Sequence, residues 1–339
     1  MAKTNLAIFC EFSNSIGTGH LIESCNLAKL AQKMGFGVSL WVTDNTPAAI
    51  LKKLSYAYNF FHSLECSAEV AKIHMKLAKA SHNKILFNFR KINNRILSLF
   101  KSPDWKLICI DELGRRRLAC DAVINTSIVK KCHSYKNGRL KIYAGPQYLT
   151  LAEDFSLMHA RKKKISRTVK NISVCMGGLD KSRTTLKIID ALAEWKKNAL
   201  KHIIIGGAAS FLNEAKDKIK KLKGKNFRLY YNVGNIARIF AKSDIAFSAG
   251  GNVLYELACV GTPAIVLYES GHEKENALTF QRRGFGICLG QGVRQKKESI
   301  VSALRKLEDL QLRRRQSYTG KKIVDAKGSR RILDIVKNL

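Results

Sequence analysis

The chain has 339 residues with 46% apolar content, which predicts two globular domains that each bury a core, and no apolar run approaches the ~20 residues that cross a bilayer. Its first residues lack the basic and apolar pattern of a signal peptide, so we expect a cytoplasmic protein. The formal net charge of +34 attracts phosphates, anionic lipid or nucleic acid, but the scattered basic clusters without interleaved aromatic residues argue against a dedicated nucleic-acid-binding protein.

The charge and the cysteines restrict the partners further. We expect a solvated basic surface and no specific nucleic-acid partner, while weak contact with an anionic membrane stays open as an alternative. Nine cysteines without a Cys-x-x-Cys pair, most of them in apolar runs, indicate free buried thiols rather than disulfides or a zinc site. The sequence contains no Asp-x-Asp pair to hold a divalent ion on a diphosphate, so we predict no metal and no other cofactor.

In the first half of the chain, short apolar runs alternate with helical patterns. The run 5–10 predicts a first strand, which a loop joins to a helix over about 20–34, and the segment 68–100, rich in Lys, Asn and helix formers, predicts helical cover. Further strands are predicted at 38–42, 105–110, 122–124 and 140–143. This alternation is typical of a parallel sheet covered on both faces, so we assign 1–150 to an N-terminal Rossmann-like domain.

The loop after the first strand contains the first chemically informative sequence, Gly17-Thr18-Gly19-His20. Its glycines let the backbone turn tightly and approach a ligand, and a helix start presents N–H groups to an anion. The positive end of the helix favours a neutral imidazole at His20, which can take a proton from water. We therefore predict that His20 is a catalytic base and that the three residues before it bind substrate. A histidine that only caps or packs is the alternative.

A charged connector, 151–170, separates this half from a second series of strands and helices. Strands are predicted at 172–176, 202–205, 227–231, 244–247 and 264–267, and helices at 184–195, 211–222, 236–241 and 253–260. The region 171–339 therefore predicts a second Rossmann-like domain, which binds the nucleotide, and its tail 297–339 predicts two helices that could pack back on the first domain. Because ligands bind at the carboxyl ends of such strands, we expect the site in the cleft between the domains.

Two glycine turns of the second half follow predicted strands. One turn, Gly250-Gly251-Asn252, opens a helix and offers backbone N–H groups to a diphosphate, and Glu256 lies one turn later, where a carboxylate can reach the hydroxyls of a ribose. The other turn contains Gly177, Gly178 and Asp180, which we also predict to bind substrate at the cleft. An ordinary strand-to-helix turn is the alternative in both places, so the ordered set of motifs carries more weight than either turn alone.

Together these motifs resemble the GT-B-type nucleotide-sugar enzymes, and more closely the UDP-2,4-diacetamido-2,4,6-trideoxy-β-L-altropyranose hydrolases of pseudaminic acid biosynthesis. The matching motifs are Gly17 to His20, Asp111 to Arg116, Cys120-Asp121 with Asn125, Gly145-Pro146-Gln147-Tyr148, Gly177 to Asp180, Ser248 to Glu256, and Glu275-Asn276. The resemblance runs from about Ala7 to Gly290. It implies that substrate also contacts Asp111, Asn125, Tyr148, Glu275 and Asn276.

The resemblance implies an α/β, GT-B-like fold and the hydrolysis of a UDP-activated amino sugar. His20 would activate water for attack at the anomeric carbon, and UDP would leave with inversion at that carbon. A GT-B glycosyltransferase, in which an acceptor hydroxyl replaces water, is the alternative and also fits a basic, membrane-peripheral protein. Glu23 and Ala277 stand where the family usually has arginine and glutamine, which keeps a non-catalytic sugar-nucleotide binder as a third hypothesis. The sugar, the base and the oligomeric state stay open.

Overall fold

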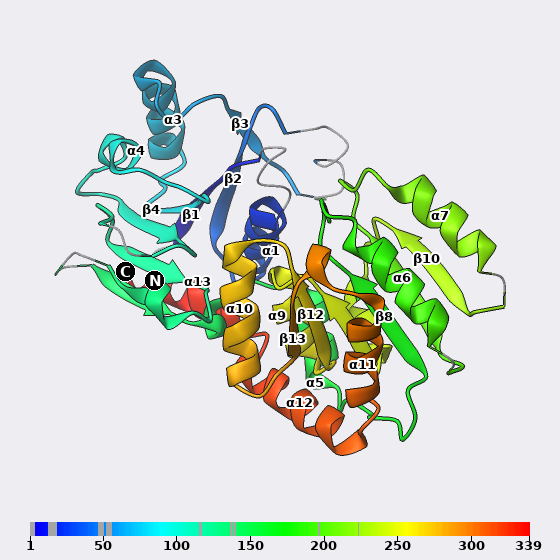
Figure 1. Ribbon diagram of the computed structural model, residues 1–339. Coiled ribbons are helices and arrows are strands. Elements are labelled where there is room, and N and C mark those ends of the chain that lie inside the picture. Colours follow the sequence, from blue (N-terminus) through cyan, green and yellow to red (C-terminus); the bar gives the residue numbers. More distant parts are fainter. Residues whose placement is uncertain are drawn as a thin grey trace. The chain divides into compact units, whose positions relative to one another are not determined.

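Two parallel β-sheets organise the computed structural model, which describes residues 4–12, 19–46, 51, 56–114, 117–135, 138, 140–195, 197–222 and 224–339 (Figure 1). The chain divides into two units. The first consists of Met1–Ala152 with Lys327–Leu339, and the second consists of Glu153–Ala326. Each unit has its own sheet and its own hydrophobic core.

In the described residues, the sheet of the first unit has seven parallel strands in the order β3-β2-β1-β4-β5-β6-β7. Its strands are β1 (Asn5–Cys10), β2 (Gly37–Thr43), β3 (Asn59–Phe61), β4 (Lys84–Asn88), β5 (Lys106–Ile110), β6 (Ala122–Asn125) and β7 (Lys141–Ala144). Its helices include α1 (Gly19–Lys33), α3 (Ser67–Lys79), α4 (Asn94–Leu99), α13 (Gly328–Asn338) and the short 3-10 helices η1 (Lys130–His133) and η2 (Pro146–Tyr148). The strand order reverses between β1 and β4, which is where doubly wound sheets bind ligands.

The central strands of this sheet are continuous apolar runs because helices cover both of its faces. In β1, Ile8 belongs to the core on one face and Phe9 to the core on the other, and neither is exposed to solvent. The Phe9 ring stacks against Trp41 and Phe87 of the two neighbouring strands, with ring centroids 5.4 Å apart in both pairs. Helix α1 follows β1 and is succeeded by Gly35, whose φ of +85° is the left-handed conformation that commonly ends helices.

Strand β4 lies in the middle of this sheet, within the segment 68–100 that we predicted as helical cover. That prediction is wrong over Lys84–Asn88, although α3 and α4 flank the strand. Its apolar core, Ile85-Leu86-Phe87, is only three residues long, too short to distinguish a strand from a helix by its period. Pairing with β1 and β5 and burial on both faces decide for the strand.

In the described residues, the sheet of the second unit has six parallel strands in the order β10-β9-β8-β11-β12-β13. Its strands are β8 (Asn171–Cys175), β9 (Leu200–Ile205), β10 (Phe227–Tyr231), β11 (Ile245–Ser248), β12 (Ala264–Tyr268) and β13 (Ile287–Gln291). Its helices include α5 (Glu153–Ala160), α6 (Thr184–Glu194), α7 (Leu212–Lys221), α8 (Ile236–Lys242), α9 (Asn252–Val260), α10 (Gly271–Arg282), η3 (Gly292–Arg294), α11 (Lys297–Lys306) and α12 (Leu310–Ile323). Here the strand order reverses between β8 and β11.

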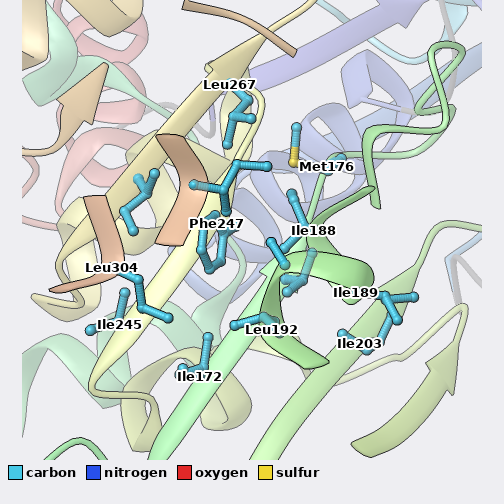
Figure 2. Packing of buried hydrophobic residues seen from close by; sticks show 14 of the residues in the cluster. Ile172, Met176, Ile188, Ile189, Leu192, Ile203, Ile245, Phe247, Leu267 and Leu304 are labelled. Carbon is cyan, nitrogen blue, oxygen red and sulfur yellow. The ribbon is translucent and has the colours of Figure 1, made fainter. Parts of the chain in front are cut away.

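One apolar cluster holds this second sheet to its helices, as Figure 2 shows. Ile188 and Leu192 of α6 point from the helix toward Ile172 and Phe247 of the two central strands, and Leu304 of α11 reaches the same cluster. Burying each of these side chains contributes about 1.5–3 kcal/mol relative to leaving it in water. The two strands whose ends carry the glycine turns are therefore anchored at the centre of the core.

The connector and the tail differ from their predicted forms. The segment 151–170, predicted as a linker, contains helix α5, which belongs to the second unit. The tail 297–339 contains three helices rather than two. The first two belong to the second unit, and only α13 belongs to the first. The apolar face of α13 contributes Ile332, Leu333 and Val336 to the core beside β1, a pattern of one helical face.

Candidate functional site

The predicted base, His20, lies in the first turn of α1, directly beyond the carboxyl end of β1. It is half-buried. Gly19 begins the helix, while Gly17 and Thr18, also predicted to bind substrate, fall outside the described residues. His20 therefore lies at the point where the strand order of the first sheet reverses.

The side chain of Asn88 fixes the orientation of the His20 ring. Asn88 is the last residue of β4, is level with Cys10 at the end of β1, and is fully buried. Its Oδ1 lies 2.9 Å from Nδ1 of His20, and its Nδ2 donates to the backbone oxygen of His20 at 3.2 Å and to Oγ of Ser24 at 3.1 Å. Because a backbone oxygen only accepts, the nitrogen of the Asn88 amide must face it and Oδ1 must face the ring.

This arrangement sets the tautomer of a neutral His20. Nδ1 donates its proton to Asn88 Oδ1, so the lone pair of the imidazole is on Nε2. Nε2 has no hydrogen-bond partner among the described residues. The pair therefore has the geometry of a general base whose far nitrogen is held by a second group. Asn88 was not predicted as a site residue, because the strand that carries it was itself not predicted.

Asp111 follows β5 and Asn125 ends β6, at the same edge of the first sheet, but their polar groups form hydrogen bonds to the loops that follow these two strands. The hydroxyl of Tyr135 donates to Oδ2 of Asp111 at 2.7 Å, and Nδ2 of Asn125 lies 2.7 Å from the same hydroxyl. Asp111 also accepts from the backbone N–H of Gly114, and Asn125 donates to the backbone oxygen of Cys132. Both residues are fully buried. Their observed role is to organise the loops after β5 and β6, and contact with substrate stays a prediction.

Tyr148 ends η2 and packs inside the first unit. Its ring makes an edge contact with Tyr143, at 6.1 Å between centroids. Helix α13 closes against the same short helix, because Arg331 donates from Nη1 to the backbone oxygen of Gln147 at 2.9 Å. A Cβ at Gly328, the first residue of α13, would lie 2.1 Å from the backbone oxygen of Leu149. Tyr148 is thus half-buried in a fixed position, and its predicted contact with a sugar is not tested by this packing.

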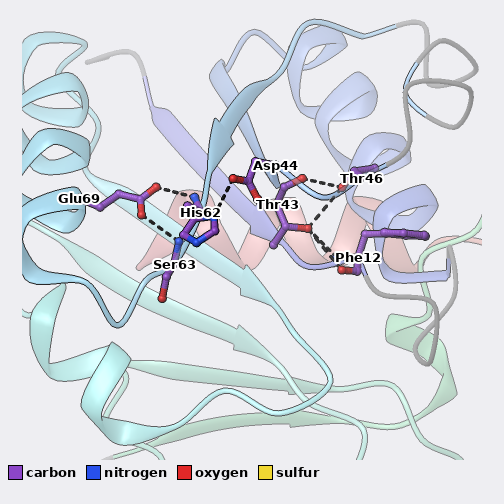
Figure 3. Close-up of polar contacts among 7 residues, drawn as sticks. All are labelled: Phe12, Thr43, Asp44, Thr46, His62, Ser63 and Glu69. Carbon is purple, nitrogen blue, oxygen red and sulfur yellow. Dashed lines mark hydrogen bonds and ion pairs between the residues drawn. The ribbon is translucent and has the colours of Figure 1, made fainter.

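A polar cluster at the carboxyl ends of β2 and β3 fixes the point where the chain leaves β1 (Figure 3). Thr43 Oγ1 accepts from the backbone N–H of Phe12 at 3.1 Å and also lies 3.4 Å from the backbone oxygen of Phe12. Nearby, Asp44 pairs with Nδ1 of His62 at 2.7 Å, and hydrogen bonding to this carboxylate raises the pKa of His62. Glu69 accepts from the backbone N–H of Ser63. His62 is 80% exposed, so this pair orders the surface beside the edge rather than its core.

In the second unit, the two glycine turns lie side by side at the reversal of the strand order. Ser248, the last residue of β11, is level with Cys175, the last residue of β8. A Cβ at Gly177 or Gly178 would meet nothing within 4 Å, so the first turn borders open space. Gly250 has φ of +121°, and a Cβ there would lie 2.8 Å from the backbone oxygen of Glu273. Glycine is thus required at Gly250 both by its backbone conformation and by its close approach to α10.

The two turns present different groups at their helix starts. Asp180 is buried, and its carboxylate accepts from the backbone N–H of Thr184 at 2.8 Å and of Thr185 at 2.9 Å, at the start of α6. Burial raises the pKa of Asp180, and the hydrogen bonds from Thr185 and Thr184 oppose that shift. Helix α9, by contrast, has Gly251 at its N-cap and no side-chain cap. Asn252 is exposed in its first turn.

Asn276 joins the glycine turn to helix α10. It is buried, its Oδ1 accepts from the Tyr255 hydroxyl at 3.2 Å, and its Nδ2 donates to the backbone oxygen of Gly250 at 3.2 Å. The same Nδ2 lies 3.3 Å from Nε2 of His272, so in the neutral imidazole Nδ1 of His272 carries the proton. That Nδ1–H has no hydrogen-bond partner among the described residues. His272 was not predicted, although it stands four residues before Asn276 on the same helix.

Glu256 and Glu275 are both half-buried. Glu256 lies one turn into α9. The pKa of the Cys175 thiol is raised to about 12, mainly by the burial of Cys175 and to a smaller extent by the negative charge of Glu256. Glu275 lies on α10, and its backbone oxygen accepts from the hydroxyl of Thr279. The roles predicted for both carboxylates stay predictions.

Within the described residues, no three His, Cys, Asp or Glu side chains are grouped so that they could hold a metal ion. In that same part of the chain, no helix combines the length and the apolar character needed to cross a membrane.

Comparison with known proteins connects this geometry to a class of protein. Residues 172–333 match the glycosyltransferase family 28 C-terminal domain. Over 265 residues the chain is 28% identical to the spore coat polysaccharide biosynthesis protein SpsG of Bacillus subtilis, covering 75% of this chain and 76% of that protein. An uncharacterised protein of Methanocaldococcus jannaschii is 21% identical over 280 residues, which cover 80% of this chain and 57% of that protein.

Solved structures share the fold at low sequence identity. MurG of Acinetobacter baumannii matches with a TM-score of 0.70 at 13% identity, covering 99% of this chain and 100% of MurG. Anabaena HepE, in complex with UDP and glucose, matches with a TM-score of 0.57 at 15% identity, covering 98% of this chain and 100% of HepE. The two Rossmann-type parallel sheets are therefore those of the GT-B fold, which confirms the predicted fold class.

Within that class, the chain is a family-28-like enzyme that processes nucleotide sugars, similar to SpsG.

Proposed function

We propose that the protein hydrolyses a UDP-activated amino sugar, as do the enzymes of pseudaminic acid biosynthesis that its motifs resemble. The observation that carries the proposal is the His20–Asn88 pair at the reversal point of the first sheet. A histidine with its Nδ1 proton held by a buried amide is prepared to accept a proton at Nε2.

The reaction follows from that proton acceptor. Nε2 of His20 takes a proton from water as the water oxygen bonds to the anomeric carbon of the sugar. The bond between that carbon and the phosphate oxygen breaks, and its electron pair leaves with the diphosphate as UDP. Attack from the face opposite the leaving group inverts the configuration at the anomeric carbon. Asn88 acts as a positioning residue, since it contacts the ring rather than the reacting atoms.

The second unit supplies groups suited to the departing diphosphate. Helix α9 starts at glycine without a side-chain cap, so the positive end of its dipole is not matched by a carboxylate of its own N-cap. Nδ1–H of His272 adds a donor beside the Gly250 turn, and the buried Ser248 hydroxyl at the end of β11 has no partner among the described residues. Oriented donors of this kind stabilise negative charge as it develops on the leaving group.

A glycosyltransferase is the second candidate, and the match of residues 172–333 to a glycosyltransferase domain favours it. The same base would then take the proton of an acceptor hydroxyl instead of water. The two candidates share the nucleotide site and differ only in the nucleophile, so they are separated by whether UDP is released without an acceptor.

The test is UDP release from a panel of UDP-amino sugars without acceptor, by wild type, His20→Ala and His62→Ala. We expect His20→Ala to lower kcat by roughly 10²–10⁴-fold with little change in UDP affinity, because the lost group acts on water. His62→Ala removes an exposed histidine at the same sheet edge and should leave the rate near that of wild type. UDP binding without release from any sugar of the panel would reject the hydrolase in favour of the transferase.

A further inference from the structure

A second surface of the molecule is built from two segments that contain no acidic residue. Segments 161–170 and 310–323 contain eleven Lys and Arg residues and no Asp or Glu. Segment 161–170 is the part of the predicted connector that follows α5, and it is called the connector below. Segment 310–323 is helix α12, drawn in orange-red in Figure 1. Both belong to the second unit.

Three cations of these segments are used internally and fix the connector. Arg313, fully buried on α12, donates to the backbone oxygens of residues 166 and 167 at 2.9 and 3.0 Å. Two turns further along α12, Nζ of Lys321 donates to the backbone oxygen of Arg161 at 3.0 Å. Lys163 points the other way, donating to the backbone oxygens of Ala241 and Ser243 at the end of α8. The connector therefore lies along α12, antiparallel to it.

With the connector fixed, the remaining cations of both segments face solvent. We use the term α12 basic surface for the exposed residues Lys162, Lys164, Arg314, Arg315, Tyr318 and Lys322. Arg314, Tyr318 and Lys322 follow one another at four-residue spacing, so they form one stripe of the helix. Beside them, Lys162, Lys164 and Arg314 line a hollow of about 500 Å³, together with Lys163 and Ile165. Because the exposed side chains of Lys162, Lys164 and Arg314 border this hollow, it is suited to a phosphate group.

The single aromatic residue of this surface decides between two anionic partners. Tyr318 is 64% exposed, and Nζ of Lys322 lies 4.4 Å from its ring centre, so one face of the ring is covered by a cation. Proteins that bind single-stranded nucleic acid need several free aromatic faces on which bases stack, and these two segments contain no other aromatic residue. A tyrosine flanked by an arginine and a lysine is instead the arrangement that lies at the headgroup level of a bilayer.

We propose that the α12 basic surface docks the protein on an anionic bilayer, with lipid phosphates in the hollow and Tyr318 at the headgroup level. The proposal does not depend on which nucleophile the enzyme uses. Exposed lysines occur elsewhere too, but those on α7 alternate with Glu214 and Asp217, whereas the α12 basic surface has no such counter-charge. The proposal therefore concerns a localised surface rather than the net charge.

The test compares two triple variants of equal charge change. Lys162→Glu with Lys164→Glu and Arg314→Glu alters the α12 basic surface, and Lys216→Glu with Lys220→Glu and Lys221→Glu alters exposed positions of α7 as the control. Co-sedimentation is measured with vesicles of phosphatidylcholine alone and mixed with phosphatidylglycerol, at about 150 mM salt. Each cation near such a surface contributes roughly fivefold to partitioning, so the first triple should weaken binding by about 100-fold or more, and the control triple only slightly.

Three outcomes would overturn the proposal. The wild type could fail to bind the anionic vesicles, the two triples could weaken binding equally, or a single-stranded oligonucleotide could bind more tightly than the vesicles and lose affinity in the same triple. Tyr318→Ala is the second variant, which keeps every charge. It should weaken vesicle binding by several-fold if the ring inserts among the headgroups, and its thermal unfolding should match that of wild type, since the ring is exposed.

Discussion

Helices α6 and α9 both begin at the carboxyl edge of the second sheet, after the two adjacent strands β8 and β11, but different groups meet their first N–H groups. At α6 the carboxylate of Asp180 accepts two of them from within the chain. At α9 the N-cap is Gly251, which has no side chain with which to cap the helix. One helix start is thus already matched by an internal anion, while the other is suited to an external one.

The first unit shows the same contrast between polar groups that are paired within the chain and polar groups that are left for a ligand. Asp111, Asn125 and Tyr135 satisfy one another in a buried network, whereas His20 has one ring nitrogen held by Asn88 and the other without a partner among the described residues. Polar residues at a sheet edge are therefore of two kinds, those that complete the fold and those whose remaining donor or acceptor can serve a ligand. Variants at four positions test this distinction.

The largest effect is expected when α9 is made to resemble α6. In Gly251→Asp, a carboxylate takes the N-cap position, and a Cβ there has its nearest neighbour, Oε1 of Glu273, 3.7 Å away, so the side chain fits but lies near a second carboxylate. We expect UDP affinity to fall by roughly 100-fold because the new carboxylate repels the diphosphate, while thermal stability changes little because the capping of α9 is opposed by repulsion from Glu273. Isothermal titration with UDP measures the loss.

Gly251→Asn is the matched control, because it caps the helix without a charge. It should lose much less affinity than Gly251→Asp. Unchanged UDP binding by the aspartate variant would show that the diphosphate does not lie at the start of α9.

Removing the group that holds His20 is expected to have the next largest effect. In Asn88→Leu, Nδ1 of His20 loses its acceptor, so the ring is no longer held in one orientation and tautomer. We expect kcat to fall by roughly 10–100-fold with UDP affinity retained. Asn88→Asp keeps an acceptor and adds a charge that favours the imidazolium, so its pH–rate profile should move to higher pH. If Asn88→Leu changed only the unfolding temperature, Asn88 would be a structural residue alone.

A smaller effect, on stability rather than on binding, is expected at α6. Asp180→Ala removes the carboxylate that accepts from Thr184 and Thr185, which should lower the free energy of unfolding by about 1–2 kcal/mol. UDP affinity should change little, because this helix start is already occupied by the chain itself. Urea unfolding and UDP titration of the same variant measure the two quantities. A loss of affinity as large as that of Gly251→Asp would remove the distinction between the two helices.

Asp180 also gives a pH dependence with a definite sign. Its pKa is raised in the folded state by burial, so the folded chain holds this proton more tightly than the unfolded chain does. Its contribution to stability is therefore complete below the ordinary carboxyl range and is lost as pH rises through the raised folded pKa. Asp180→Asn should remove that part of the pH dependence of urea unfolding.

The smallest effect is expected from the closed network of the first unit. Tyr135→Phe removes the hydroxyl between Asp111 and Asn125, but both residues keep hydrogen bonds to the backbone. We expect a loss of about 1 kcal/mol in the free energy of unfolding and no change in the rate of UDP release. A fall in kcat with unchanged stability would indicate that Asp111 or Asn125 acts on substrate after all.

The sequence determined the features that depend on local order. Continuous apolar runs such as Leu6 to Cys10 predicted buried parallel strands, and glycines such as Gly250, with its φ of +121°, marked the turns after them. The alternation of these elements was enough for two Rossmann-like α/β domains and placed His20 after the first strand, while the GT-B class came from the resemblance of the motifs to a known family. It could not identify β4, because a run of three apolar residues among helix formers has no decisive period.

Only the tertiary structure decided which polar groups face a partner. Asp111 and Asn125 stand at strand ends as predicted, but Tyr135, from a later loop, satisfies both. Asn88 reaches His20 because β4 pairs with β1 across 78 positions of sequence, from Cys10 to Asn88. Hydrogen bonding depends on distances between atoms, and a parallel sheet brings together residues whose separation in sequence carries no information about those distances.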